Sequence, residues 1–328
     1  MNKKMKITNA MIDPQLRALG RLMRVIDPFS SEKKLHRLNK MTKRYFAGRK
    51  IKGMSCESIT IPQHNCGSEL RICIMKSAHL QENVPGVLWL HGGGYAIGSA
   101  EMVAMTMPRF LMAQSSCVII SPDYRLSVES PYPAALEDAY AALVWMKEHA
   151  SELGIDDTRL IVGGESAGGG LAAALCLYAR DKKEVSISFQ MPLYPMLDDR
   201  METESEKDND APVWNSKANC AAWKLYLGTL YGTDKVPPYA SPARATDYTQ
   251  LPPAVSFVGS IEPFCDETIA YFENLRTAGI PADLKVYDGC YHSFDVLKPK
   301  ANASIAAISF VLDRYKYAIE NYSAEQPQ

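Results

Sequence analysis

The stretch Leu160-Ile161-Val162-Gly163-Gly164-Glu165-Ser166-Ala167-Gly168 decides how this chain folds. A short apolar run ends in a glycine-bounded turn, and the turn opens a helical pattern rich in Ala and Leu. In this G-x-S-x-G arrangement a serine sits on a sharp turn between a strand and a helix, with its hydroxyl exposed above the sheet. The glycines suit so tight a turn because larger side chains would clash there. The pattern predicts a nucleophile at Ser166, and a glycine-rich helix start without chemistry is the alternative.

Similar apolar runs recur on both sides of this stretch and alternate with helical patterns. The runs lie at 57–61, 70–76, 87–90, 117–121, 160–162, 187–191, 255–258 and 284–287. The helical patterns lie at 102–114, 134–150, 167–180, 267–278 and 305–319. The first two runs are separated by turn formers and predict a hairpin. The remaining alternation predicts a mostly parallel sheet with buried strands and with helices on both faces.

A second motif, His91-Gly92-Gly93-Gly94, directly follows the run at 87–90. Consecutive glycines leave backbone N–H groups free to point into a site, as an oxyanion hole requires. Losing one such donor typically costs about 3 kcal/mol of transition-state stabilisation. A flexible turn and a phosphate-binding loop are the alternatives. The phosphate loop is disfavoured because no Lys-Ser or Lys-Thr follows and the spacing is not G-x-G-x-x-G.

Together the two motifs resemble the hormone-sensitive-lipase-like family of α/β-hydrolase esterases, over roughly residues 57–320. Asp123-Tyr124-Arg125-Leu126 and the stretch Tyr132-Pro133-Ala134-Ala135-Leu136-Glu137-Asp138 look like a structural segment of that family. The resemblance implies an α/β-hydrolase fold, with a mostly parallel eight-stranded sheet flanked by helices and a helical cap. It divides the chain into an N-terminal helical arm at 1–56, core at 57–197, a cap insertion at 198–240 and core at 241–328.

A hydrolase serine needs a base and an acid, in the chain order Ser, Asp or Glu, then His on this fold. Of the six histidines only His292 follows Ser166, in a turn after the run at 284–287. The acid role falls by resemblance on Glu262, where the family usually has Asp. Asp266 is the competing candidate, although capping of the helix start also explains that residue.

The resemblance implies a serine carboxylesterase that hydrolyses short-chain esters through an acyl-enzyme, with backbone N–H groups of Gly93, Gly94 and Ala167 as the oxyanion hole. It implies no metal and no organic cofactor. Two other functions stay open: a non-catalytic small-molecule receptor on the same scaffold, and an amidase or peptidase with the same triad. Glu165 either supports the turn geometry or is a solvated first-turn carboxylate.

The arm and the insertion have unusual charge. The first 55 residues carry 15 basic and 3 acidic side chains, and residues 198–210 carry seven acidic and two basic ones. Complementary charge between the two segments is one hypothesis, solvated surfaces are the second, and attraction of the arm to an anionic membrane is the third. Trp214, Trp223 and Tyr226 in the insertion either line a substrate pocket or form the core of the cap itself.

Composition excludes several classes of protein. The 328 residues have a net charge of −1 and 47% hydrophobic side chains, and no apolar run approaches the ~20 residues of a membrane span. The sequence therefore favours a small-molecule ester as partner, with no nucleic acid and no stable membrane insertion, and leaves a homodimer open.

Positive charge at the N-terminus is followed by no signal-peptide pattern. The eight cysteines form no C-x-x-C pair, which favours a reducing, cytoplasmic setting and no zinc site, with a Cys66–Cys73 disulfide as an open alternative.

Overall fold

The computed structural model describes residues 6–25, 29, 31–46, 54–62, 69–77 and 80–327. The sheet has the strand order β1-β2-β4-β3-β5-β6-β7-β8. The first two pairs in this order are antiparallel and the others are parallel, so the mostly parallel eight-stranded sheet is confirmed. The strands are β1 (Met54–Pro62), β2 (Glu69–Ser77), β3 (Val84–Leu90), β4 (Val118–Pro122), β5 (Ile155–Glu165), β6 (Phe189–Leu193), β7 (Ala254–Gly259) and β8 (Ala282–Tyr287).

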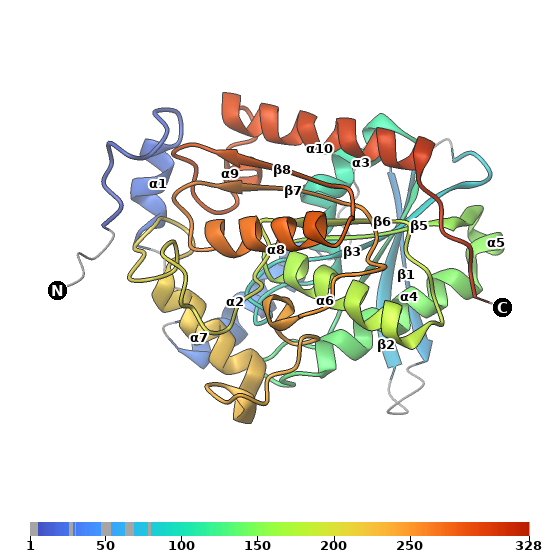
Figure 1. Ribbon diagram of the computed structural model, residues 1–328, viewed down its shortest axis with the longest axis horizontal. Helices are drawn as coiled ribbons and strands as arrows, with labels where there is room; N and C mark the ends of the chain where they lie inside the picture. The colour runs from blue at the N-terminus through green and yellow to red at the C-terminus, as the bar shows by residue number, and fades with distance from the viewer. Residues whose placement is uncertain are drawn as a thin grey trace.

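Helices cover both faces of the sheet, as Figure 1 shows. Successive side chains of β3 alternate between two cores, with Val87 and Trp89 in one and Leu88 and Leu90 in the other. The first core is completed by α3 (Met107–Gln114) and α10 (Asn302–Asn321), and the second by α4 (Ala134–Glu148), α6 (Ala167–Lys182) and α8 (Cys265–Thr277). The shorter helices are η2 (Ala100–Met105), α5 (Ala150–Leu153), η3 (Gly228–Leu230), η4 (Pro242–Arg244) and α9 (Phe294–Leu297).

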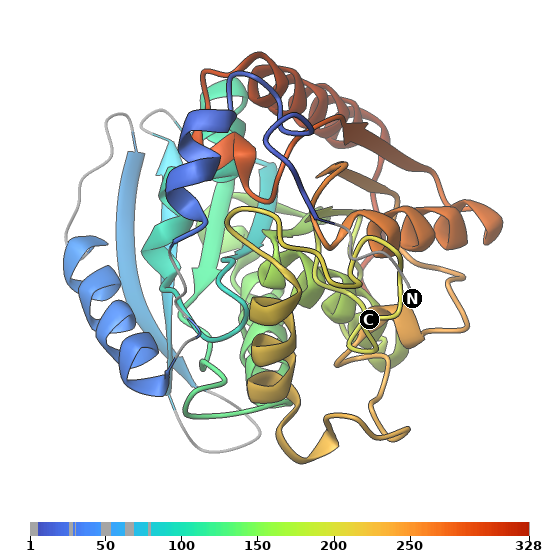
Figure 2. The ribbon, with the colours of Figure 1, turned by 90° about the vertical axis from the view of Figure 1, so that its left-hand side faces the viewer.

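The arm and the insertion contribute three further helices on one side of the molecule. The arm holds α1 (Arg17–Met23) and α2 (Glu32–Phe46), and the insertion holds α7 (Ser216–Leu227). Figures 1 and 2 show all three beyond the carboxyl ends of the parallel strands, where this fold places its sites. None of the described helices is long and apolar enough to cross a membrane.

The structure differs from the sequence prediction in the first and the last strand of the sheet. β1 begins at Met54, three residues before the predicted start of the core. β8 is not buried on both faces but alternates between half-buried and exposed side chains, because it is the edge strand of the sheet. The hairpin of β1 and β2 is confirmed, and Cys73 on it is a buried thiol. Cys66 lies outside the described residues, so the structure does not test the Cys66–Cys73 alternative.

Candidate active site

Three strands of the sheet bring Ser166, Glu262 and His292 together. Ser166 follows β5, Glu262 follows β7 and His292 follows β8, each at the carboxyl end of its strand. His292 Nε2 lies 2.8 Å from Ser166 Oγ, and His292 Nδ1 is hydrogen-bonded to Glu262 Oε2. All three side chains are almost fully buried. The arrangement provides a nucleophile, a base within proton-transfer distance and a carboxylate that fixes the imidazole tautomer.

The turn that carries Ser166 has the backbone geometry predicted from its motif. Ser166 has φ 60° and ψ −122°, a conformation that non-glycine residues rarely adopt. Its N–H donates to Leu193 O at 3.0 Å, so the turn is anchored to β6. A Cβ at Gly168 would collide with the backbone oxygens of Leu90 and His91. Only glycine therefore allows α6 to start this close to the end of β3.

Glu262, and not Asp266, contacts His292. The second oxygen of Glu262, Oε1, accepts a hydrogen bond from Gly259 N at 2.7 Å, so the carboxylate is held at both ends. Asp266 faces away and accepts from Ser205 N at 2.8 Å. The Glu262 carboxylate therefore bridges the backbone at the start of its own turn and the His292 ring.

The glycine run forms a loop beside Ser166. Gly92 and Gly93 line the same cavity as the serine, and Gly93 has φ 121°, which side-chain-bearing residues avoid. Ala167 begins α6, and the first N–H groups of a helix have no partner within it. Gly94 packs against Trp214 of the insertion and Phe29 of the arm, which leaves no room for a Cβ.

The arm holds this loop from the outside through one buried side chain. Asn39 of α2 donates through Nδ2 to Ala96 O at 2.8 Å, and its Oδ1 accepts from Gly98 N at 3.2 Å. Nothing in the sequence singled out Asn39, because its partners lie 57 and 59 residues away along the chain.

A cavity of about 270 Å³ opens above Ser166. Its walls come from the core, the arm and the insertion, and most of the side chains that line it are apolar. They are Met23, Phe29, Gly92, Gly93, Ile97, Met102, Thr106, Glu165, Ser166, Tyr194, Val213, Trp214, His292, Ser293 and Val296.

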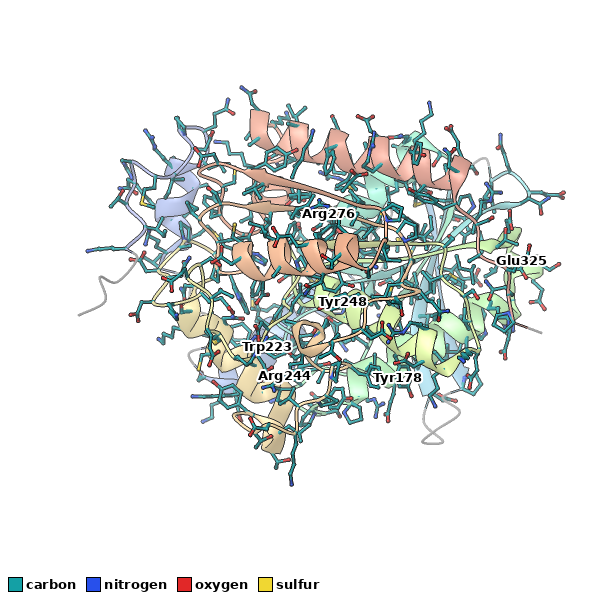
Figure 3. The ribbon with its side chains drawn as sticks, viewed as in Figure 1. Tyr178, Trp223, Arg244, Tyr248, Arg276 and Glu325 are labelled. Carbon is teal, nitrogen blue, oxygen red and sulfur yellow. The ribbon has the colours of Figure 1, made fainter. Side chains whose placement is uncertain are left out.

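The three aromatic residues predicted for a substrate pocket have different positions. Trp214 lines the cavity, with its ring centroid 6.0 Å from that of His292. Trp223 and Tyr226 do not line it but are buried where α7 meets the core. Figure 3 labels Trp223 beside α7. Tyr226 is stacked on Tyr95 at 3.7 Å between centroids. Both therefore fit the alternative in which they form the core of the cap.

Glu165 is a buried structural carboxylate and not a solvated one. Its Oε2 accepts from Trp89 Nε1 at 3.0 Å and its Oε1 from Met107 N at 3.2 Å. It therefore joins the serine turn to the start of α3, next to Thr106 in the cavity wall. Burial raises the pKa of Glu165 to about 7, against the opposing effect of these hydrogen bonds. Burial likewise raises the pKa of Asp295, three residues after His292, to about 7.

The insertion contacts the loop that carries Glu262. Ser205 Oγ donates to Pro263 O at 2.6 Å and accepts from Asp266 N at 3.0 Å. Asn209 Nδ2 donates to Ile261 O at 3.1 Å. The segment 203–209 is therefore bound along the acid loop, a contact that the acidic composition of the insertion did not predict.

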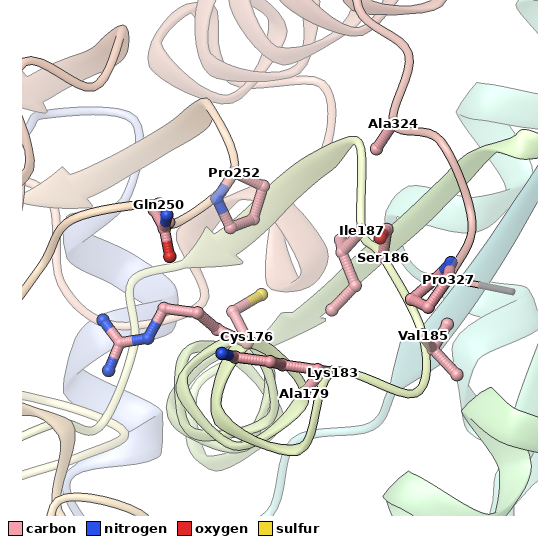
Figure 4. A pocket seen from close by; sticks show the side chains of 11 residues that line it. Cys176, Ala179, Lys183, Val185, Ser186, Ile187, Gln250, Pro252, Ala324 and Pro327 are labelled. Carbon is pink, nitrogen blue, oxygen red and sulfur yellow. The ribbon is translucent and has the colours of Figure 1, made fainter.

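A second cavity, of about 390 Å³, lies near the amino ends of β6 and β7 (Figure 4). Its lining includes Cys176, Arg180 and Lys183. Burial raises the pKa of the Cys176 thiol, and Arg180 is paired with Asp181 at 2.7 Å. The larger cavity thus has no activated nucleophile among its lining residues.

Comparison with known proteins gives a consistent result. A family model described as alpha/beta hydrolase fold matches residues 87–296. Esterase LipI of Mycobacterium tuberculosis is 36% identical over 215 residues, which cover 65% of this chain and 67% of that protein. Carboxylesterase NlhH of the same organism is 34% identical over 220 residues, covering 66% and 68% of the two chains.

Solved structures match over almost the whole chain. A bacterial heroin esterase superposes with a TM-score of 0.87 at 33% identity, covering 95% of this chain and 99% of the other. Esterase LipW from Mycobacterium marinum superposes with a TM-score of 0.83 at 28% identity, covering 95% and 97%.

Proposed function

Because this chain belongs to the α/β-hydrolase family of hormone-sensitive-lipase-like esterases, we propose that it is a serine carboxylesterase acting on short-chain esters. The observation that supports this function best is the hydrogen-bonded series Ser166–His292–Glu262 at the floor of an apolar cavity. The names of the similar proteins support carboxylic ester hydrolysis as the reaction class.

The proposed mechanism follows from the order of these contacts. His292 Nε2 takes the proton of Ser166 Oγ as the oxygen attacks the ester carbonyl carbon. Glu262 keeps the Nδ1 proton in place and stabilises the imidazolium. The carbonyl oxygen becomes an oxyanion and accepts hydrogen bonds from the N–H groups of Gly93, Gly94 and Ala167. His292 then protonates the leaving alkoxide, and an acyl-enzyme remains on Ser166.

The second half of the reaction repeats these roles with water. His292 removes a proton from a water molecule that attacks the acyl carbon, and returns the proton to Ser166 as the acid leaves. The limited volume and apolar lining of the cavity favour a short acyl chain. We also propose a reducing, cytoplasmic setting, supported by the buried thiols of Cys117, Cys176, Cys265 and Cys290.

A series of p-nitrophenyl esters with graded acyl chains tests the proposal, with the wild type and Ser166→Ala side by side. We expect the highest kcat/KM on the short esters and a loss of at least about 10⁴-fold in Ser166→Ala. A matched p-nitroanilide series separates an esterase from an amidase, which would cleave both. Saturable ester binding without hydrolysis dependent on Ser166 would instead support a receptor.

A further inference from the structure

Two buried glutamates meet where the insertion joins the core. Glu206 lies in the insertion and Glu267 in the first turn of α8, with exposed fractions of 0% and 1%. Each carboxyl group is among the groups that shift the pKa of the other, so the two face each other. Two carboxylates that face each other away from water repel, so this arrangement favours a proton on one of the two groups. The pair therefore holds at least one proton that the proposed mechanism does not use.

Glu267 fixes the point at which the chain leaves the core. Its Oε1 accepts from Leu197 N at 2.7 Å and its Oε2 from Asp198 N at 3.1 Å. Both donors lie just after β6, where the insertion begins. Glu267 is thus the fixed, core side of the pair.

Glu206 continues the connection toward the cavity. Its Oε2 accepts from Thr203 Oγ1 at 2.9 Å, and its Oε1 accepts from Asn219 Nδ2 at 3.1 Å. Asn219 Oδ1 in turn accepts from Trp214 Nε1 at 3.3 Å. A series of hydrogen bonds therefore runs from Glu206, which faces Glu267 of α8, to the aromatic wall beside His292.

The charges around the pair favour keeping the proton. Asp198 faces both carboxyl groups but is paired with Arg200 at 2.7 Å, and Tyr95 faces Glu267 from the core. Burial raises the pKa of Glu206 to about 8. Burial, with the neighbouring Glu206 carboxyl, raises the pKa of Glu267 well above its ordinary value. Removing the proton to solvent would leave two carboxylates in contact in a desolvated place.

We infer that Glu206 and Glu267 share a proton that positions Trp214 against the bound ester, so that both are positioning residues for the reaction. This inference rests on the proposed esterase function. When the proton is lost, repulsion displaces the Glu206 side chain and, through Asn219, Trp214 leaves its place beside His292. Ester binding then weakens, while the hydrogen bonds from Ser205 and Asn209 to the Glu262 loop keep Ser166, His292 and Glu262 in contact. The expected signature is a rise in KM at alkaline pH that exceeds any fall in kcat.

The kinetic test compares the wild type, Glu206→Gln and Glu204→Gln on a short p-nitrophenyl ester from about pH 6.5 to about pH 9. The glutamine amide donates to the Glu267 carboxylate and to Thr203 Oγ1 without a titratable proton. Glu204 is the matched control because it lies in the same segment with a side chain 88% exposed. We expect the wild-type KM to rise about tenfold by pH 9, as the protonated fraction falls. Glu204→Gln should follow the wild type, and Glu206→Gln should stay within about twofold.

A thermal unfolding series over the same pH range needs no substrate and separates the two proposals. A carboxyl whose folded pKa is raised contributes its full stability below its unfolded pKa and loses it as pH rises toward the folded value. The Tm of Glu206→Gln relative to the wild type should therefore increase from about pH 5 to about pH 8, and that of Glu204→Gln should not. If no ester is hydrolysed in a Ser166-dependent way, the esterase proposal fails. The unfolding series still tests whether Glu206 and Glu267 share a proton.

Three results would overturn the inference. A Tm difference that is constant with pH excludes the shared proton, and coincident KM profiles exclude the positioning role. Asn219→Ala interrupts the series between Glu206 and Trp214, and we expect it to raise KM at every pH while leaving the wild-type dependence of Tm on pH. If Glu206→Gln does not fold, the test uses the KM of Asn219→Ala and the dependence of the wild-type KM on pH. A wild-type KM that does not change with pH contradicts the inference.

Discussion

The Glu262 carboxylate is held by two contacts, one to the backbone of its own turn and one to His292. Gly259 N holds one carboxylate oxygen while the other faces His292 Nδ1. A carboxylate held in this way has little freedom to reorient as the imidazole becomes charged. Its contribution is therefore orientation of the base, and the effect of substitutions should follow geometry more than charge.

We expect Glu262→Gln to lower kcat about 10⁴-fold, because an amide in this place favours the wrong imidazole tautomer. Asp266→Asn is the matched control, because it removes the competing carboxylate but keeps an oxygen to accept from Ser205 N. Its kcat should stay within a few-fold of the wild type. Steady-state kinetics on one short ester measures both, and equal losses in the two variants would contradict the assignment.

Trp214 should set the limit on acyl length, since it lines the cavity beside His292. Trp214→Ala opens the wall, and we expect the ratio of kcat/KM on hexanoate to that on acetate esters to rise about tenfold. Tyr226→Phe changes a buried aromatic of the cap that does not line the cavity, and it should leave the ratio unchanged. If kcat/KM depends on acyl length in Trp214→Ala as it does in the wild type, a residue other than Trp214 limits the acyl length.

At this scale the sequence pointed to Ser166 and His292, whose side chains lie within hydrogen-bond distance, but not to most of the residues around them. Ser166 and His292 follow from a motif and from chain order, which need no knowledge of packing. The sequence could not tell the role of Trp214 from that of Trp223, because a cavity wall and a cap core both use buried aromatic side chains. Met23 and Phe29 carry no sequence signal of their own, since they reach the cavity only through the path of the arm.

The helix α2 is the element that holds the glycine loop. Asn39 is its buried polar residue, and it both donates to and accepts from the loop backbone. Removing it would leave a buried carbonyl and a buried N–H without their partner, which typically costs about 1–3 kcal/mol each. The loop also carries the proposed oxyanion donors, so the cost should appear in the rate as well as in stability.

We expect Asn39→Ala to lower kcat about tenfold with little change in KM, because loosely held donors stabilise the transition state less. Lys40→Ala, at the next and exposed position of α2, should behave as the wild type. Kinetics and Tm measured together check this, and a lower Tm with an unchanged kcat would show that α2 stabilises the fold without ordering the loop.

The elements themselves were largely predictable, because most central strands are compact apolar runs and the segments between them are long and rich in helix-forming residues. β8 was the exception in burial, since the identity of an edge strand depends on sheet order and not on local pattern. The contact between 203–209 and the acid loop was also beyond prediction. It consists of hydrogen bonds from Ser205 and Asn209 to backbone groups, and such contacts leave no periodic signature.

At the scale of the whole molecule, most of the paired acids of the insertion have their partners outside the arm. Arg24 forms an ion pair with Asp210 at 3.6 Å between the two segments. The buried acids of the insertion are held elsewhere: Asp199 pairs with Arg244 of η4, and Glu206 contacts Glu267. Among the described contacts, complementary charge therefore contributes little to holding the arm and the insertion together.

We therefore expect KM to change by no more than about twofold between about 0.05 M and about 1 M NaCl, since partly exposed ion pairs contribute little. Asp210→Asn removes the charge but keeps the oxygen that accepts from Ile7 N, so it should reproduce at low salt the wild-type behaviour at high salt. A KM that rises tenfold or more with salt would restore complementary charge as the main attraction.

The hydrogen bonds between 203–209 and 261–267 also limit how the cap can be exchanged. A chimera that takes residues 198–240 from a relative would lose the side chains that hold the Glu262 loop, and would be impaired even with an intact set of catalytic residues. The cap and the loop that carries Glu262 therefore depend on each other. We expect such a chimera to be active only when both segments come from the same protein.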